Sequence, residues 1–268
     1  MVDTSLLGRI LAPGSLTVRF QPVLDVRGAR PRLHYVEALI RGPAGTTAEC
    51  PTILFDYARK KNKEAAVDRA CVRAILEAAR DLPRDTVLGV NVHASSLAMD
   101  AGFTPFLLSS LEAAGIPPAR AVVEIVEHAP PWDAAGLRSA LGRLRSQGVR
   151  IALDDVGLGH SNYRMILECQ PDYFKVDRHF VNGCHRDFQR RAVLTSIALL
   201  ARLFRGHVIA EGVEKPSELT ALTGLGIHLV QGFLFGRPAP AALFAESPRA
   251  RRPSGERAVA AGGRRGAR

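Results

Sequence analysis

Short apolar segments alternate with longer amphipathic ones along almost the whole sequence, and this alternation restricts the possible fold more than any other feature. The apolar segments have the length of buried strands and cover residues 16–24, 33–40, 87–92, 121–126, 149–153, 173–176, 207–210 and 228–233. Helical patterns lie between them over residues 51–59, 63–79, 105–114, 134–147, 161–167, 188–204 and 216–223. Strands that alternate with helices in this way predict an α/β fold with a parallel sheet, closed as a barrel or doubly wound.

The first connection between strands is the exception to this alternation. Only residues 25–32 join the first two predicted strands, which is too short for a crossover helix, so that pair should be antiparallel. The chain has 268 residues, of which 47% are hydrophobic, and an α/β barrel commonly reaches this size as one domain. We therefore expect a (β/α)8 TIM-type barrel with an antiparallel first strand over residues 16–245, after an N-terminal lead of residues 1–15.

The net charge of +10 raises the question of nucleic-acid binding, and its distribution along the chain bears on the answer. Residues 246–268 contain seven arginines and two glutamates in a segment rich in glycine, alanine and proline. Such a composition buries too little apolar surface to fold. We expect a basic, disordered C-terminal tail and no specific nucleic-acid binding.

The sequence also bears on cellular compartment. No apolar run approaches the ~18 residues that would indicate a membrane span, and the first residues lack the pattern of a signal peptide. The four cysteines are widely spaced and form no C-x-x-C pair, so neither a zinc site nor a disulfide framework is indicated. We expect a cytoplasmic protein without a membrane segment.

Polar side chains interrupt or end nearly every predicted strand. In α/β barrels the carboxyl ends of the strands form the face that carries catalysis. Polar groups at so many strand ends would be costly to bury unless they share a solvated or metal-filled site. We therefore expect the following residues to converge there: Glu37, Asn91, Glu124, Asp154, Asp155, Lys175, Glu211 and Gln231.

The chemistry of this set favours hard cations. Five carboxylates and one amide oxygen suit Mg²⁺ or Mn²⁺, whereas zinc would require histidine or cysteine. So many carboxylates would repel one another without cations to offset their charge. Adjacent strand residues point to opposite faces, so Asp154 and Asp155 could face the barrel axis and the rim and bridge two ions. Two ions about 3.5–4 Å apart are the usual device for phosphoester displacement, and Lys175 would add a cation near the developing charge.

A series of motifs resembles the EAL domain family. Glu37-Ala38-Leu39 matches the triplet for which the family is named, and Ile40-Arg41 continues it. Further matches are F-Q-P-V at 20–23, V-N-V at 90–92, E-I-V-E at 124–127, D-D-V-G at 154–157, K-V-D at 175–177, A-E-G-V-E at 210–214 and Q-G-F-L-F at 231–235. Their order and spacing follow the family from about residue 16 to residue 244.

The resemblance implies a (β/α)8 barrel that hydrolyses cyclic di-GMP (c-di-GMP) to the linear dinucleotide pGpG with Mg²⁺ or Mn²⁺. It implies that one ion is held by Glu37, Asn91, Glu124 and Asp154, and a second by Asp154, Asp155 and Glu211. It implies catalytic roles for Lys175, Glu211, Gln231 and Glu127, the last as an anchor of the loop after Asp155. It implies substrate binding by Gln21, Leu39, Arg41 and Asp177, with Arg41 on a phosphate, because a guanidinium binds phosphate bidentately. A homodimer is a further implication.

The sequence departs from the family in the loop after the paired aspartates. Residues 154–162 read D-D-V-G-L-G-H-S-N where the family usually has D-D-F-G-T-G-Y-S-S, and His93 replaces the usual serine after the V-N-x motif. Because this loop couples metal, substrate and dimer interface in the family, a second hypothesis is a c-di-GMP receptor or interaction module with little or no turnover. A third, an unrelated barrel hydrolase with Glu124 and Glu211 as an acid/base pair, uses only two of the eight polar positions.

Overall fold

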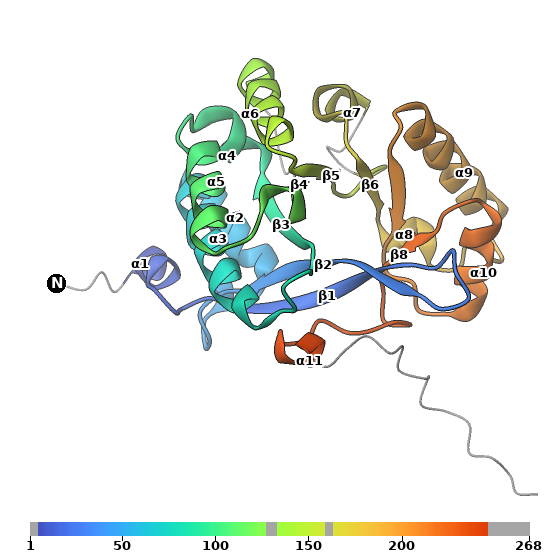
Figure 1. Ribbon diagram of the computed structural model, residues 1–268, viewed down its shortest axis with the longest axis horizontal. Coiled ribbons are helices and arrows are strands. Elements are labelled where there is room, and N and C mark those ends of the chain that lie inside the picture. Colours follow the sequence, from blue (N-terminus) through green and yellow to red (C-terminus); the bar gives the residue numbers. More distant parts are fainter. Residues whose placement is uncertain (1–4, 127–132, 159–162, 246–268) are drawn as a thin grey trace, which may run out of the picture.

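The structure of the protein, a computed structural model, describes residues 5–126, 133–158 and 163–245. Eight strands form a closed barrel in sequence order, and helices surround it (Figure 1). The strands are β1 (Thr17–Asp25), β2 (Arg32–Arg41), β3 (Leu88–His93), β4 (Ala121–Val126), β5 (Arg150–Leu153), β6 (Tyr173–Val176), β7 (His207–Ala210) and β8 (Leu229–Val230). The expected TIM-type α/β barrel is therefore confirmed.

The helices follow the strands as the periodicity predicts, with several short additions. They are α1 (Leu6–Leu11), α2 (Pro51–Lys60), α3 (Glu64–Ala78), α4 (Ala94–Met99), α5 (Phe103–Ala113), α6 (Ala134–Ser146), α7 (Tyr163–Cys169), α8 (Arg178–Val181), α9 (Phe188–Leu203), α10 (Pro216–Gly224) and α11 (Ala242–Ala245). Short 3₁₀ helices are η1 (Thr47–Glu49), η2 (Ala79–Asp81) and η3 (Pro118–Arg120). Helices α1, α4, α8 and α11 were not predicted, because four to six residues are too few to show a helical period.

The barrel closes through antiparallel pairing at β1. Strand β1 pairs antiparallel with β2, where Gln21 lies opposite Glu37, and antiparallel with β8, where Leu24 lies opposite Val230. All other neighbouring strands are parallel. The expected antiparallel first strand is confirmed, and it places residues from both ends of the described chain side by side.

Strand β8 is shorter than the predicted segment 228–233. It covers only Leu229–Val230, and the chain then turns, with the Phe235 N–H donating to the Gly232 carbonyl at 3.0 Å. Gly232 lies so close to the loop after β7 that a Cβ would be 2.3 Å from the Val213 nitrogen. The prediction was wrong beyond Val230 because a tight turn of apolar residues has the same local pattern as a strand.

Apolar side chains fill the barrel interior only up to the level at which the polar side chains begin. Most buried apolar side chains lie between the sheet and the helices. A smaller cluster fills the barrel interior and consists of Val23, Tyr35, Val122, Ala152, Tyr173, Ile209 and Leu229. The polar side chains expected to converge follow these interior residues along the parallel strands, towards the carboxyl end.

Some expectations fall on residues that the structure does not describe. Glu127, most of the altered loop (residues 159–162) and the predicted tail (residues 246–268) lie outside the described residues. Within the segment expected to be an N-terminal lead, Ile10 of α1 is buried against the main core. Among the described helices, none is both long and apolar enough to cross a lipid bilayer.

Candidate active site

Each strand, or the residue that follows it, contributes one polar side chain to the end of the barrel at which β2 to β8 finish, and antiparallel β1 contributes from its middle. They are Gln21 on β1, Glu37 on β2, Asn91 on β3, Glu124 on β4, Asp154 after β5, Lys175 on β6, Glu211 after β7 and Gln231 after β8. Contacts between neighbours join them into one polar ring, which is the name we use below. Because parallel strands end at the same edge of a sheet, residues spread over the sequence meet at one place.

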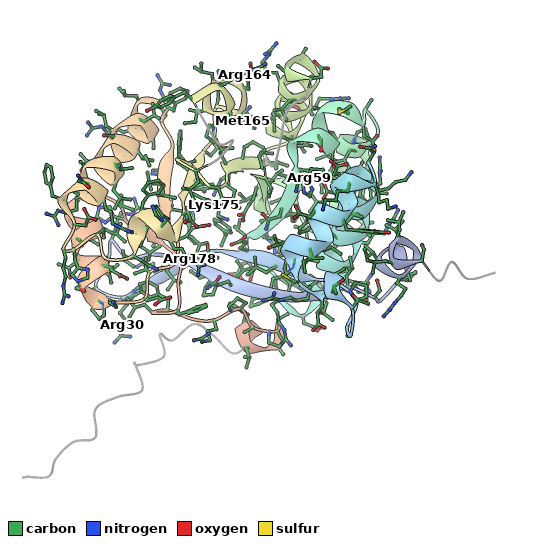
Figure 2. All side chains as sticks on the ribbon, turned by 180° about the vertical axis from the view of Figure 1, so that it is seen from behind. Arg30, Arg59, Arg164, Met165, Lys175 and Arg178 are labelled. Atoms are coloured by element: carbon green, nitrogen blue, oxygen red, sulfur yellow. The ribbon has the colours of Figure 1, made fainter. Side chains whose placement is uncertain are left out.

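Lys175 occupies the centre of the polar ring, near the middle of the molecule (Figure 2). Its Nζ lies 2.5 Å from Glu124, 2.8 Å from Glu211, 3.2 Å from Asp154 and 3.3 Å from Glu37. Burial alone would lower the pKa of Lys175, but Asp154 and the other carboxylates raise it well above its usual value. Lys175 is therefore a permanent, fully buried cation.

The Glu37 carboxylate on β2 links β3 to the residue that follows β8. Its carboxylate accepts a hydrogen bond from the Asn91 amide at 3.0 Å and another from the Gln231 amide at 2.6 Å. The Gln231 amide also donates to Gln21 at 3.1 Å. Burial acts to raise the pKa of Glu37, but Lys175 and these amides lower it overall, so this carboxylate is ionised.

The polar ring contains more carboxyl groups than one lysine could offset if all of them were ionised. Burial first, and the charge of Glu37 second, raise the pKa of Glu124 to about 8. Burial and the nearby carboxylates also raise the pKa of Glu211 well above its ordinary value. Among the described residues, Oε1 of Glu124 and Oε1 of Gln231 are buried without a hydrogen-bond partner. The unpartnered oxygens, together with the negative charge that these carboxyl groups carry once ionised, suit hard divalent cations.

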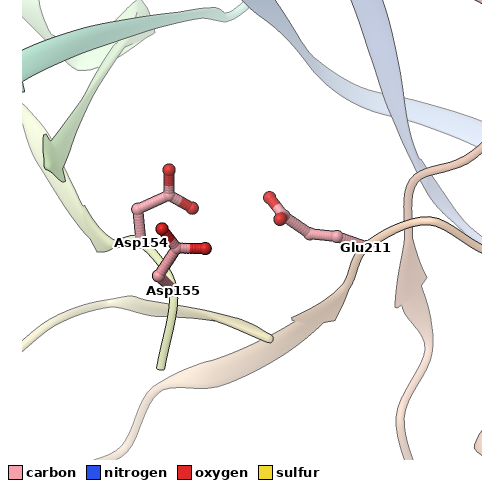
Figure 3. Close-up of side chains that lie close together, drawn as sticks. All are labelled: Asp154, Asp155 and Glu211. Carbon is pink, nitrogen blue, oxygen red and sulfur yellow. The ribbon is translucent and has the colours of Figure 1, made fainter. Parts of the chain in front are cut away.

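Asp155 lies beside the polar ring and forms a cluster of three carboxylates with two of its members, Asp154 and Glu211. Oxygen atoms of Asp154, Asp155 and Glu211 lie within 4.8 Å of one another, and the side chains face each other from the ends of β5 and β7 (Figure 3). Asp155 is more exposed than Asp154 and has a φ of 52°, a left-handed conformation that costs a non-glycine residue about 1–3 kcal/mol. This backbone turn lets both aspartates face Glu211. Burial and the charge of Asp154 raise the pKa of Asp155 to about 6.

Two pockets open beside the polar ring. A pocket of about 260 Å³ is lined by Gln21, Leu39 and Asp177, and a pocket of about 210 Å³ is lined by Leu39 and Arg41. The residues expected to bind substrate therefore flank the expected metal ligands. Asp177 also accepts the His179 N–H at 2.7 Å and so caps α8.

The sequence did not predict a buried pair that lines the smaller pocket, Asp68 of α3 and His93 of β3. One oxygen of the Asp68 carboxylate accepts a hydrogen bond from the His93 backbone N–H at 3.0 Å. The other oxygen lies 2.8 Å from Nδ1 of the His93 ring. The His93 ring packs edge-on against Phe55 of α2. His93 attracted notice as a departure from the family, but nothing local to α3 indicates that Asp68 would reach the end of β3.

Comparison with known proteins agrees with this geometry. Residues 6–238 match the EAL domain family. The chain belongs to this family. It is 30% identical to the cyclic di-GMP phosphodiesterase NbdA of Pseudomonas aeruginosa over 253 residues, which are 92% of this chain and 32% of that protein.

Solved EAL structures share the barrel. The Klebsiella pneumoniae BlrP1 manganese/c-di-GMP complex matches with a TM-score of 0.74 and 31% identity over 85% of this chain and 57% of that chain. The MucR phosphodiesterase of Pseudomonas aeruginosa in complex with c-di-GMP matches with a TM-score of 0.74 and 28% identity, over 85% and 99% of the two chains. The chain spans less than half the length of the curated relatives it matches.

Proposed function

We propose that this EAL domain hydrolyses c-di-GMP to linear pGpG with two divalent cations, Mg²⁺ or Mn²⁺. The main support for the proposal is the polar ring, to which every strand supplies either a side chain with an oxygen atom that can bind a cation or the central ammonium group. Relatives with about 30% identity are c-di-GMP phosphodiesterases, and solved neighbours hold manganese or calcium together with c-di-GMP. Their activity supports the proposal for this chain.

We assign the ligands to two groups that share Asp154. One cation would be held by Glu37, Asn91, Glu124 and Asp154, and a second by Asp154, Asp155 and Glu211. When bound, the cations would polarise a phosphodiester and an attacking water molecule. The Asn91 amide nitrogen donates to Glu37, which turns its amide oxygen away from that carboxylate and leaves it for a cation.

The remaining residues of the site bind and orient. The Lys175 ammonium group fixes the positions of four carboxylates and offsets part of their charge. Gln231 holds Glu37 and Gln21 in place through its amide. Arg41 is exposed at the end of β2, where its guanidinium group would bind a phosphate of the dinucleotide bidentately. We also propose that Glu127 anchors the loop after Asp155 and that Asp177 contacts the substrate.

The test is hydrolysis of c-di-GMP by the purified protein with Mg²⁺ or Mn²⁺, with products separated by chromatography. Formation of pGpG that stops with EDTA is expected, and Glu37→Ala should abolish it while weakening Mn²⁺ binding in calorimetry. The exposed variant Glu112→Gln is the control. Saturable c-di-GMP binding without pGpG under either metal would replace the enzyme with a receptor, and full activity of Glu37→Ala would contradict the metal assignment.

We also propose that the protein forms a homodimer through an apolar groove. The groove has a volume of about 790 Å³ and lies between the loop after Asp155, α7 and α9, where Tyr163, Leu199 and Leu203 are exposed. A second copy would cover these side chains, since paired identical surfaces are the commonest form of self-association. Light scattering after size exclusion should give a dimer that Leu203→Glu converts to a monomer, and a monomeric wild-type protein would refute the proposal.

We propose the cytoplasm as the site of the reaction. The four cysteines all lie among the described residues, where no disulfide joins them, and three of them are buried, which is usual for proteins of reducing compartments. Thiol titration of protein purified without reductant should give four free groups under denaturing conditions. Disulfides in freshly isolated protein would contradict this location.

A further inference from the structure

The end of the barrel opposite the polar ring is strongly basic. Strands β2 to β8 are parallel, so the connections that lead into them meet at one edge of the sheet. With the helix and strand ends that border them, these connections cover residues 25–32, 79–87, 114–120, 143–150, 170–172, 202–207 and 224–228. They contain eleven arginines and four aspartates, with no lysine or glutamate. We call this end of the barrel the basic face.

Five of the eleven arginines bond to groups of the protein itself. Arg150, at the start of β5, donates to the Tyr173 hydroxyl at 3.0 Å. The others bond to backbone carbonyls or to neighbouring carboxylates, and they are Arg27, Arg80, Arg120 and Arg145. These five arginines therefore have a structural role that needs no external partner.

The other six arginines are exposed. Among the ion pairs and side-chain hydrogen bonds of the described residues, their guanidinium groups take part in none. Two of them lie in the last turns of α6 and α9, where the helix dipole favours a cation. The remaining four lie in loops or at the start of β2, where no helix dipole explains them. The six are Arg30, Arg32, Arg84, Arg143, Arg202 and Arg205.

The chemistry of these six side chains suits phosphate groups. Exposed cations gathered at one end of a protein create a positive potential that attracts polyanions. A guanidinium group can bind a phosphate bidentately. A nucleic acid presents phosphates at regular spacing and releases condensed counterions when arginines neutralise them, so several arginines act together. The basic face therefore has the composition of a surface that binds a phosphate backbone.

An anionic lipid surface is the competing polyanion. Peripheral membrane binding gains much of its strength from apolar side chains that enter the lipid layer. Among the described residues, Leu203 is the only exposed large hydrophobic side chain in these connections, and it lines the apolar groove proposed for the homodimer. The basic face thus offers charge without an apolar anchor, which favours a nucleic acid over a membrane.

The positions of the six arginines favour a flexible strand over a stiff duplex. They belong to connections that lead into β2, β3, β5 and β7, which lie at separate positions around the closed barrel. A DNA duplex bends little over such a distance, because its persistence length is about 50 nm. A single strand can follow the circumference of the barrel and reach arginines from several connections.

We propose that the basic face binds the phosphate backbone of single-stranded nucleic acid, without reading its base sequence. Arg30 lies at the edge of the molecule, away from Lys175 of the polar ring (Figure 2). A strand bound at the basic face therefore leaves the polar ring open to c-di-GMP. The proposal goes beyond the proposed function and is independent of it.

The test is binding of a fluorescein-labelled, mixed-sequence RNA of about 20 nucleotides, which exceeds the usual site size of one domain, to the full-length protein. Fluorescence anisotropy measures the affinity at several salt concentrations. The triple variant Arg30→Gln, Arg84→Gln and Arg143→Gln should bind about 100-fold more weakly at about 0.1 M salt, and the slope of log affinity against log salt should become shallower by about 2. Arg84→Gln alone should weaken binding about fivefold under the same conditions.

A charge-matched control separates the basic face from net charge. The triple variant Lys60→Gln, Lys61→Gln and Lys63→Gln removes the same charge from exposed positions around the end of α2 and should bind RNA as wild type. Both triple variants should keep the thermal midpoint and the c-di-GMP hydrolysis rate of the wild type, since neither changes the polar ring.

Three results would overturn the proposal. All variants keep the seven arginines of residues 246–268, so wild-type RNA affinity in the arginine triple variant would assign the binding to that segment instead. Equal weakening in the lysine triple variant would reduce the effect to net charge. Sedimentation of the wild type with phosphatidylglycerol vesicles, combined with no binding of the RNA, would make the basic face a membrane surface.

Discussion

The buried carboxyl group of Glu124 predicts a pH-dependent loss of stability in the metal-chelated protein. Its pKa of about 8 in the folded protein compares with 4.5 for an ordinary glutamate. Below about pH 4.5 both folded and unfolded chains hold the proton, so stability is intact. As the pH rises from 4.5 to 8 the unfolded chain loses the proton first, and the free energy of unfolding falls by about 3 kcal/mol at pH 7.

The variant Glu124→Gln removes this dependence because an amide does not ionise. In EDTA, its stability relative to wild type should increase by about 2 to 3 kcal/mol between pH 5 and pH 7, since the loss at pH 5 is below about 1 kcal/mol. Urea denaturation followed by circular dichroism measures both values. The comparison between the two pH values cancels any constant effect of the amide on Lys175, which lies 2.5 Å from Glu124.

A matched control and a clear contrary result accompany this experiment. Glu112→Gln makes the same chemical change on the exposed surface of α5 and should leave the pH dependence as in wild type. With Mn²⁺ added, the wild type should regain the stability lost at pH 7, because a cation would offset the ionised carboxylate. If the difference between Glu124→Gln and wild type is the same at pH 5 and pH 7, the assigned pKa is wrong.

Three further predictions concern the surroundings of the site. Gly89→Ala places a Cβ 2.2 Å from Glu124 Oε1 and should cost about 1–3 kcal/mol in urea denaturation and weaken Mn²⁺ binding in calorimetry; unchanged values would contradict the close contact. Asp68→Asn weakens the double contact with His93 and should lower stability by about 2 kcal/mol, seen as a lower urea midpoint. Arg41→Ala should raise KM for c-di-GMP about tenfold with kcat little changed; a loss in kcat alone would place Arg41 in the chemical step instead.

The barrel could be predicted from the sequence because the same pattern, a short apolar run followed by an amphipathic segment, recurs along the chain. Each strand was a short apolar run, and the short connection over residues 25–32 revealed the antiparallel start. Errors arose where a pattern was too short or ambiguous. The six residues of α4 show no helical period, and the turn at Gly232 continues an apolar run that resembles a strand.

The site was predictable only where strand order brings residues together. The polar ring follows from the rule that parallel strands end at one edge, so Glu37 and Glu124 could be grouped without a structure. Contacts that depend on side-chain reach were not predictable. Nζ of Lys175 at the centre of four carboxylates, and Asp68 reaching the end of β3, are set by packing in three dimensions and leave no mark in local sequence.

The seam at which the barrel closes has a consequence for how the protein is made. Gln231 bonds to Gln21 and to Glu37, residues that leave the ribosome some 200 residues earlier. Glu37 on the second strand therefore lacks its Gln231 partner until β8 and the residues after it have been synthesised. A nascent or prematurely terminated chain that ends before β8 would carry most of the carboxylates but lack Gln231, so the polar ring can assemble fully only after β8 has been synthesised.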